Sequence, residues 1–276
     1  MIKRILVSTD GSERAMVGVR YAVALAKQYG ATLHGIHVVD IKLLEGPFLR
    51  DISASLGTAP YVNYQGSISL ILEERGAAAL DAFKRACEAD GVAYETTLAT
   101  GVVTRSILEA SEGADLLVMG RAGEHTQWLD GLVGSTTESV VRRATLPVLI
   151  TNTDTPGTKR LVAAYDGSRY AKRALKAAAG MSLDWHMPCH VLVVDEGNGP
   201  EILEEARVYL KPYETDADYV LRPGDPSEAI VAYAEECEAD LLVMGAYGHT
   251  KVRELVVGST TAYAINHSPC PVLLLR

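Results

Sequence analysis

Two glycine-spaced segments carry the residues best suited to chemistry in this chain. An oligophosphate needs several backbone N–H donors with no side chain in the way, which glycine allows. It also gains from the N–H groups and positive dipole at a helix N-terminus, where each Gly-Ser-Thr triplet is predicted to lie. The candidate phosphate-binding residues are Gly120, Gly123, Gly134, Ser135 and Thr136 in one segment, and Gly245, Gly248, Gly258, Ser259 and Thr260 in the other.

A simpler interpretation of the same residues is helix capping. Ser135 and Ser259 would then be ordinary N-caps, with Ser135 and Glu138 forming a capping box. A single copy would not separate the two interpretations. Two copies, each with paired glycines upstream, favour anion binding.

The two segments belong to a duplicated unit. The heptapeptide ADLLVMG occurs at residues 114–120 and again at residues 239–245, and each half closes on Pro-Val-Leu. With 276 residues and a common domain size of roughly 150 residues, the chain is expected to hold two domains. We predict domains at 1–152 and 158–276, joined by a linker at 153–158.

Apolar runs and helical periodicities alternate along both halves, which predicts an α/β fold with helices on both faces of a parallel sheet. The long segment 41–68 in the first half contains several glycines and prolines and is expected to be mostly loop. Strands are predicted at 5–9, 32–39, 93–98, 116–119, 147–151, 161–165, 190–194, 241–244 and 271–275; helices at 13–29, 70–89, 104–110 and 135–143, with another opening at 225–228.

One aspartate ends the first predicted strand of each half. Ligands of open parallel sheets bind beyond the carboxyl ends of the strands, where the strand order reverses. If the first and fourth strands are neighbours, Asp10 faces the loop after Gly120, and Asp166 faces the loop after Gly245. Each aspartate is then placed to meet a ribose hydroxyl or a metal, or to form an Asx turn before the next helix.

Composition excludes several other classes. The net charge of −9 argues against nucleic-acid binding, and the absence of an apolar run of about 18 residues argues against a membrane span. With no secretory leader pattern, the chain is expected to be cytoplasmic. The cysteines show no metal spacing and are expected to be structural thiols. Neither GxxxxGK[ST] nor GxGxxG after the first strand occurs, so P-loop and dinucleotide Rossmann sites are not expected.

At the glycine loops the chain resembles the universal stress protein family in its tandem two-domain form. The family's ATP-binding signature is Gly, two residues, Gly, nine residues, Gly, then Ser or Thr. The second segment matches it in full, and the first has ten residues in place of nine. The resemblance implies two Rossmann-like five-stranded domains of strand order 3-2-1-4-5, with ATP between the first and fourth strands.

The resemblance also implies roles for further residues. Asp10 and Asp166 would lie near the adenosine, Val38 and Val193 would meet adenine through their backbone, and Met119 and Met244 would line the pocket. Mg²⁺ would accompany the phosphates. The final strands 147–151 and 271–275 would pair antiparallel as an intramolecular pseudo-dimer, which also covers two apolar edges. A homodimer of the whole chain is a further option.

Two functions follow, an ATP-binding stress-response or regulatory protein whose occupancy alters its conformation or partners, and a slow ATPase or phosphotransferase. Hydrolysis would require a positioned base and a cation. The candidates Arg121, His125, His249 and Lys251 lie in the loops but are not placed alike in the two halves. We therefore interpret them as phosphate contacts or solvated residues and expect a binding protein. A scaffold that has lost its nucleotide is disfavoured by the intact second motif.

Overall fold

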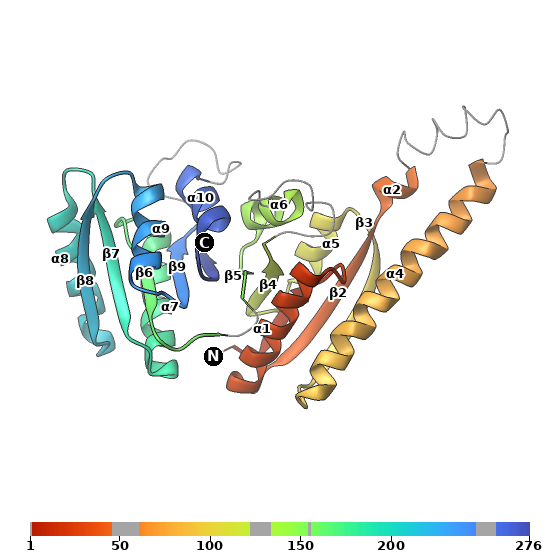
Figure 1. The fold of residues 1–276 in the computed structure, drawn as a ribbon, viewed down its shortest axis with the longest axis horizontal. Coiled ribbons are helices and arrows are strands. Elements are labelled where there is room, and N and C mark those ends of the chain that lie inside the picture. The colour runs from red at the N-terminus through yellow and green to blue at the C-terminus, as the bar shows by residue number, and fades with distance from the viewer. Residues whose placement is uncertain (1, 46–60, 122–133, 154–155, 247–257) are drawn as a thin grey trace.

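The computed structural model describes residues 2–45, 61–121, 134–153, 156–246 and 258–276, and these residues form one continuous ten-stranded sheet (Figure 1). The strands are β1 (Arg4–Ser8), β2 (Thr32–Asp40), β3 (Tyr94–Gly101), β4 (Leu116–Gly120), β5 (Val148–Thr151), β6 (Leu161–Ala164), β7 (Cys189–Asp195), β8 (Ala217–Pro223), β9 (Leu241–Gly245) and β10 (Val272–Leu275). The helices are α1 (Glu13–Tyr29), α2 (Ile41–Glu45), α4 (Tyr61–Ala89), α5 (Val103–Ala110), α6 (Ser135–Arg143), α7 (Arg169–Trp185), α8 (Gly199–Leu210), α9 (Pro226–Glu236) and α10 (Ser259–His267).

The strand order confirms the predicted topology in both halves. It runs β3-β2-β1-β4-β5-β10-β9-β6-β7-β8, so each half has the order 3-2-1-4-5 with parallel neighbours. The halves meet where β5 and β10 pair antiparallel, with Leu273 opposite Leu149. We call this β5–β10 pairing the seam. The predicted intramolecular pairing of the last strands is therefore confirmed.

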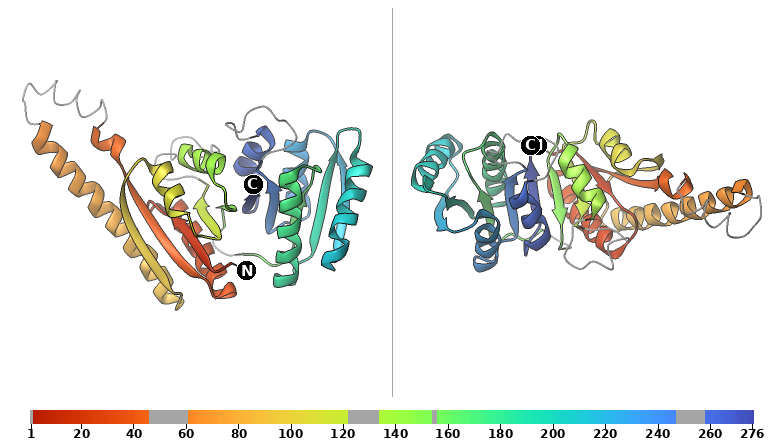
Figure 2. Two further views of the ribbon diagram at one scale, coloured as in Figure 1. Left: turned by 180° about the vertical axis from the view of Figure 1, so that it is seen from behind. Right: turned by 90° about the horizontal axis from the view of Figure 1, so that it is seen from above.

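Two apolar layers enclose the sheet, one on each face (Figure 2). Alternation along the strands sets the faces, because Ile5 and Val7 point to one layer and Leu6 to the other. The first layer is completed by α1, α4, α7 and α8, and the second by α5, α6, α9 and α10. Both layers continue through the two halves, so the pseudo-dimer shares one core.

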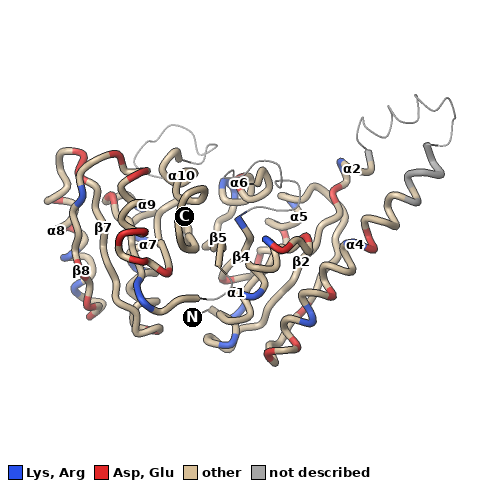
Figure 3. Tube along the Cα trace, viewed as in Figure 1, with Lys and Arg blue, Asp and Glu red and all other residues tan. Residues whose placement is uncertain are grey.

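Charged residues of both signs are spread along α4 and also occur on the edge strand β8 (Figure 3). The seam strands β5 and β10 are composed of VLIT and VLLL and are buried throughout. Their pairing hides two apolar edges that would otherwise invite aggregation. None of the helices in the described part of the chain is long and apolar enough to cross a membrane.

The first helix of each half begins at a serine cap. Ser12 Oγ accepts the N–H of Ala15 at 3.2 Å, and Ser168 Oγ accepts that of Ala171 at 3.1 Å. Because these N–H groups have no carbonyl partner inside the helix, the serine satisfies donors that would otherwise remain unpaired. At the other end of α1, Gly30 adopts φ 59°, as a left-handed C-cap does.

Replacing Ser12 with alanine should lower the free energy of unfolding by about 1 kcal/mol, since one capping hydrogen bond is lost. Urea denaturation followed by circular dichroism measures this change. Ser69→Ala is the matched control, because the Ser69 hydroxyl donates to Glu73 on the exposed side of α4 and caps no helix. Equal stability of the two variants would contradict the capping role.

The expectation of a loop over 41–68 is wrong at both ends. Residues 41–45 form α2, and α4 begins at Tyr61 instead of near residue 70 (Figure 1). Residues 46–60 lie outside the described part. Gly66 suggested a loop, but one glycine costs a helix only about 1 kcal/mol. In a helix of 29 residues, cooperative hydrogen bonding outweighs that cost.

The third strand of the second half received no residue assignment from the sequence. In the structure it is β8, an edge strand in which partly buried and exposed positions alternate, and it contains Arg222 and Pro223. Its apolar signal is weak because one of its edges and much of its surface face solvent. The helix before this strand, α8, was not predicted from the sequence either.

Candidate functional site

A cavity of about 650 Å³ lies at the carboxyl ends of the strands in the second half. It is the crevice expected where the strand order reverses, since β6 and β9 are neighbours. Part of its wall comes from the strand ends and part from the first residues of α7, α9 and α10. The residues selected from the sequence that line it are Asp166, Met244, Gly245, Gly258, Ser259 and Thr260.

The N-termini of α6 and α10 lack side-chain caps. The N-cap residues are Gly134 and Gly258, and neither helix has a capping hydrogen bond from a side chain. The capping-box interpretation of Ser135 is therefore wrong, because Ser135 is already inside the helix and Glu138 pairs with Arg142 at 2.7 Å. Helix N–H groups without caps are suited to an anion.

Both aspartates at the ends of the first strands form Asx turns. Asp10 Oδ1 accepts the N–H of Ser12 at 3.0 Å, and Asp166 Oδ1 accepts that of Ser168 at 2.9 Å. Asp166 also lines the cavity, so the turn and a ligand contact are compatible in one residue. The turn fixes the carboxylate at the mouth of the crevice while the next helix begins.

Gly120 and Gly245 are glycines for a packing reason as well. A Cβ on Gly120 would lie 2.6 Å from the Arg14 carbonyl oxygen, and one on Gly245 would lie 2.9 Å from the Ala171 nitrogen. The first turns of α1 and α7 thus sit directly on the strand ends. The glycine requirement at these two positions does not depend on a phosphate.

Close packing at the strand ends is reinforced by two threonines that the sequence analysis missed. Thr137 Oγ1 donates to the Gly120 carbonyl oxygen at 3.3 Å, and Thr261 Oγ1 donates to that of Ala246 at 3.1 Å. Each threonine follows a Gly-Ser-Thr triplet and ties a helix start to the neighbouring strand end. That repeat, Gly-Ser-Thr-Thr in both halves, was the signal available in the sequence.

The valines and methionines taken from the resemblance occupy different surroundings. Met244 lines the cavity, and Met119 is 5% exposed within the layer under α5 and α6. Val193 is fully buried on the opposite layer, and its neighbours Leu192 and Val194 line the cavity instead. A backbone contact from Val193 stays a prediction, as does one from Val38, which is partly buried against the second layer.

In the first half, the strand ends and the helix start adjoin in the same manner. β1 pairs with β4, so Asp10 and Gly120 end neighbouring parallel strands, and Gly134, Ser135 and Thr136 open α6 beyond them. Gly123 and Gly248, together with His125, His249 and Lys251, lie outside the described residues. Their predicted contacts are therefore not placed.

The cavity also contains residues that sequence reasoning did not select. They come from the starts of α7, α8 and α9 and supply hydroxyl, amide and carboxylate groups: Tyr165, Ser168, Glu196, Asn198, Asp225 and Ser227. Burial, followed by a hydrogen bond to Glu205, raises the pKa of Tyr165, so its hydroxyl stays a neutral donor. Hydrogen bonds from Ser227 lower the pKa of Asp225, which keeps it ionised.

The charge of the described lining is negative. Asp166, Glu196 and Asp225 contribute carboxylates, and among the described lining residues there is neither a lysine nor an arginine. A phosphate in this cavity would be held by backbone N–H groups and hydroxyls. Its charge would have to be offset by a cation or by the adjoining residues outside the described part. The described residues contain no group of three metal-binding side chains.

Arg121 is not a solvated loop residue. Its guanidinium is partly buried, and Nη1 donates to the Asn266 carbonyl at 3.0 Å and Nη2 to that of Ser268 at 2.6 Å. Both carbonyls belong to the C-terminal end of α10 in the other half. A contact between Arg121 and a phosphate stays a prediction. Asn152 Nδ2 donates to the same Ser268 oxygen at 3.0 Å, and Arg276 Nη1 reaches back to the Arg142 carbonyl at 3.1 Å.

These contacts make a polar clamp beside the apolar seam. The dipole of α10 places partial negative charge at the carbonyls that Arg121 binds, so the charge of the guanidinium complements it. Burial lowers the pKa of Arg121, but an arginine side chain remains protonated at neutral pH. The four cysteines, for their part, are free thiols, and Cys87, Cys189 and Cys270 are buried, as expected for structural residues.

Comparison with known proteins agrees with this architecture. The sequence profile of the universal stress protein family matches residues 1–152 and 199–276. The universal stress protein Slr1230 of Synechocystis is 28% identical, and the match covers 100% of both chains. The universal stress protein MJ0531 of Methanocaldococcus jannaschii is 34% identical over 54% of this chain and 82% of its own length.

The crystal structure of a universal stress protein from Archaeoglobus fulgidus has the same fold. It superposes with a TM-score of 0.78 at 23% identity, covering 99% of this chain and 98% of that one. A repeated α/β unit with a crevice at the strand ends thus defines a duplicated α/β protein. The chain belongs to the universal stress protein family, and it carries two domains of that family in tandem.

Proposed function

We propose that this protein is a regulatory ATP-binding protein of the stress response, in which nucleotide occupancy changes conformation or partner binding. The observation that carries the proposal is the 650 Å³ cavity, which gathers Asp166, Met244, Gly245 and the start of α10 at one crevice. Its size suits a nucleotide. The family's ATP-binding signature, matched by Gly245, Gly248, Gly258 and Ser259, supports the choice of ligand.

In this proposal the phosphates bind the N-terminus of α10 at Gly258, Ser259 and Thr260, and adenosine lies toward Asp166. Mg²⁺ accompanies the phosphates, because the described lining supplies carboxylates and no cation. The first half binds a second nucleotide at Asp10, Gly120 and the start of α6. The two domains of this proposal span residues 1–152 and 158–276, and the protein acts in the cytoplasm.

Slow hydrolysis is the alternative. It requires a positioned base, and the described lining offers Glu196 and the two aspartates that cap turns or helices. Two of these three carboxylates are already committed to backbone N–H groups. We therefore propose binding without turnover as the function. Incubation with labelled ATP tests this choice, because ADP formed over minutes in proportion to protein would favour the alternative.

Gly258→Val is the sharpest test of the phosphate site. Among the described residues, a Cβ at Gly258 would meet only Thr261 Oγ1, at 3.8 Å, so this part of the chain accommodates it. The valine methyl groups would nevertheless cover the N–H groups at the start of α10. We expect ATP affinity in the second half to fall at least about tenfold, a loss of about 1.4 kcal/mol, as calorimetry in Mg²⁺ would show.

Two internal controls accompany this measurement. Gly258→Ala adds one methyl group and should weaken binding less than valine does. The first half is unchanged in both variants and should keep its own nucleotide, and the thermal midpoint should stay near the wild-type value. Unchanged ATP affinity in Gly258→Val would show that the phosphates lie elsewhere.

A further inference from the structure

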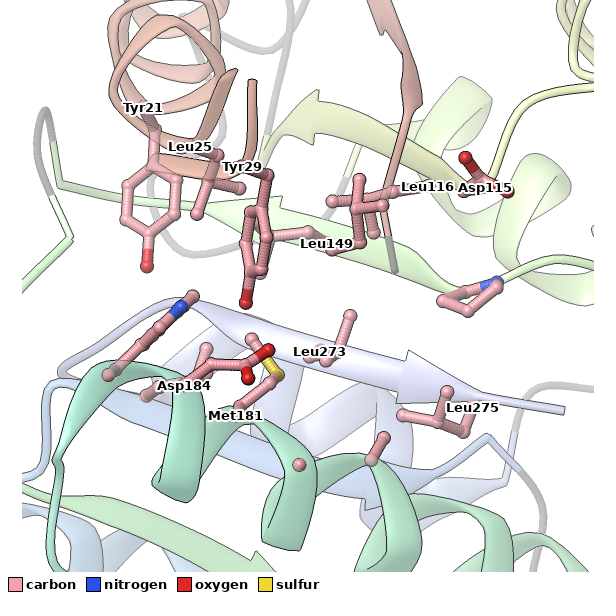
Figure 4. Close-up of a pocket in the computed structure, with 16 residues that line it drawn as sticks. Tyr21, Leu25, Tyr29, Asp115, Leu116, Leu149, Met181, Asp184, Leu273 and Leu275 are labelled. Carbon is pink, nitrogen blue, oxygen red and sulfur yellow. The ribbon is translucent and has the colours of Figure 1, made fainter. Parts of the chain in front are cut away.

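A second cavity lies between the two halves, on the face of the seam that α6 and α10 do not cover (Figure 4). Along the paired strands, Val148 and Val272 point to α6 and α10, whereas Leu149, Leu273 and Leu275 point to α1 and α7. The two helices flank these leucines and leave a groove of about 240 Å³. Its lining shares no described residue with the nucleotide cavity.

The groove has aromatic walls from both halves. Tyr21, Leu25 and Tyr29 come from α1, and Met181 and Trp185 come from α7 (Figure 4). The rings of Tyr29 and Trp185 lie 6.3 Å apart between centroids, tilted by 47°. Apolar side chains on the floor and rings on the walls suit a flat apolar molecule. An engineered apolar cavity of about 150 Å³ already binds benzene.

A buried hydroxyl without a partner points into this groove. Tyr21 is fully buried, and its hydroxyl makes no hydrogen bond among the described residues (Figure 4). Burial raises the pKa of Tyr21, so the hydroxyl is neutral and able to donate. Buried polar groups in native proteins almost always have a partner. An unpartnered donor at the wall of a groove therefore indicates an acceptor that a ligand would supply.

Trp185 provides a second donor nearby. Its buried Nε1–H has no hydrogen bond of normal geometry. The indole does interact with the Tyr29 hydroxyl, and this interaction offsets part of the rise that burial causes in the pKa of Tyr29, which reaches about 12. Both tyrosines are thus uncharged donors at neutral pH. The groove offers donors for a ligand and, among its described residues, few neutral acceptors.

The negative charge at the mouth of the groove disfavours negatively charged ligands. The exposed Asp184 carboxylate lies beside the Tyr29 hydroxyl (Figure 4) and contributes, after burial, to the raised pKa of that tyrosine. Asp115, on the opposite side, accepts the N–H groups of Lys3 and Arg4 at 2.7 and 2.9 Å. The groove lining contains no lysine or arginine among the described residues. A carboxylate ligand would be repelled there without a compensating cation.

We propose that this groove binds a small, neutral, apolar molecule that carries one hydrogen-bond acceptor, such as an aromatic ketone. The apolar body would lie on Leu149 and Leu273 between the rings of Tyr29 and Trp185. Its acceptor would take the hydrogen bond of the Tyr21 hydroxyl. Because α1 and α7 come from different halves, such a ligand contacts both domains at once.

Three probes of nearly one shape test the proposal by calorimetry on the full chain. 2-Acetylnaphthalene has the acceptor, 2-ethylnaphthalene lacks it, and 2-naphthoate replaces it with a negative charge. We expect the ketone to bind about tenfold more tightly than the hydrocarbon, as one hydrogen bond to a buried donor allows. The naphthoate should bind most weakly of the three.

Protein variants assign the effect to the groove. Tyr21→Phe removes only the unpartnered hydroxyl and should abolish the preference for the ketone over the hydrocarbon. Tyr94→Phe is the matched control, because that hydroxyl donates to Glu88 on the exposed edge of the first half and its loss should leave the preference unchanged. Met181→Trp fills the groove and should abolish binding of both probes. ATP affinity should be the same in all three variants.

Three results would overturn the proposal. The first is the absence of saturable binding of the ketone, with the wild-type chain monomeric by sedimentation. The second is a ketone preference that survives in Tyr21→Phe. The third concerns a second copy of the chain. If sedimentation shows a dimer that Met181→Trp dissociates and that excludes the probes, the groove instead binds a second copy of the chain, and the small-molecule site is rejected.

Discussion

Replacing Leu273 with lysine is expected to lower the free energy of unfolding by about 4 kcal/mol or more. Leu273 is 4% exposed and pairs with Leu149 at the centre of the seam. Lysine removes the leucine contacts and brings an ammonium group to the floor of the groove, where the buried neighbours are apolar and the carboxylates of Asp115 and Asp184 line the same groove. The halves should then separate, because the seam is their main apolar contact.

Urea denaturation and small-angle scattering measure the two consequences. The wild-type chain should scatter as one body, and Leu273→Lys should show a larger radius of gyration together with an earlier transition. Leu183→Lys makes the same chemical change on α7, where Leu183 is 48% exposed, and should alter stability by less than about 0.5 kcal/mol. A compact and fully stable Leu273→Lys variant would show that the seam contributes little.

Replacing Arg121 with methionine is expected to lower the free energy of unfolding by about 3 kcal/mol, because charged hydrogen bonds to two partly buried carbonyls are lost. Methionine keeps much of the aliphatic length and removes the guanidinium. The carbonyls of Asn266 and Ser268 then lose the donors that Arg121 supplied. Chemical denaturation measures the loss.

The Arg121→Met variant also distinguishes two roles for Arg121, a contact in the polar clamp between the halves and a contact with a bound phosphate. Arg105→Met is the control, because Arg105 pairs with Glu109 on an exposed face of α5 and contributes little. If Arg121 acts in the polar clamp, the free energy of unfolding falls and the ATP affinity of the Arg121→Met variant changes little. If Arg121→Met instead weakened ATP binding with no loss of stability, the phosphate-contact interpretation would be supported.

The fold was largely predictable because its signals are local and repeated. The heptapeptide before Gly120 and Gly245, the caps at Ser12 and Ser168 and the closing Pro-Val-Leu recur in both halves. Buried parallel strands give continuous apolar runs that single-sequence reasoning detects. The edge strand β8 and the beginning of α4 gave weaker signals, since exposure removes the apolar pattern and Gly66 imitates a loop.

The lining of the crevice was predictable where it depends on backbone geometry and not where it depends on the packing of distant segments. Asp166, Gly245 and Gly258 follow strand ends or open a helix, so local patterns locate them. Arg121 lies in the glycine loop by sequence, but its partners are 145 and 147 residues away. The groove between the two halves likewise forms only when α1 of the first half and α7 of the second half pack beside the seam. No spacing in the sequence indicates it.

The antiparallel seam has a consequence for how this protein behaves on dilution and how its halves differ. Because β5 and β10 belong to one chain, their pairing is unimolecular, with an effective concentration on the order of millimolar that dilution does not reduce. A symmetric homodimer must present two identical surfaces and two identical sites. Here the residue after β4 is Arg121 and its counterpart after β9 is Ala246, so each half carries a different part of the contact. Covalent pairing therefore allows the linings of the two crevices to differ, which the symmetry of a homodimer would not.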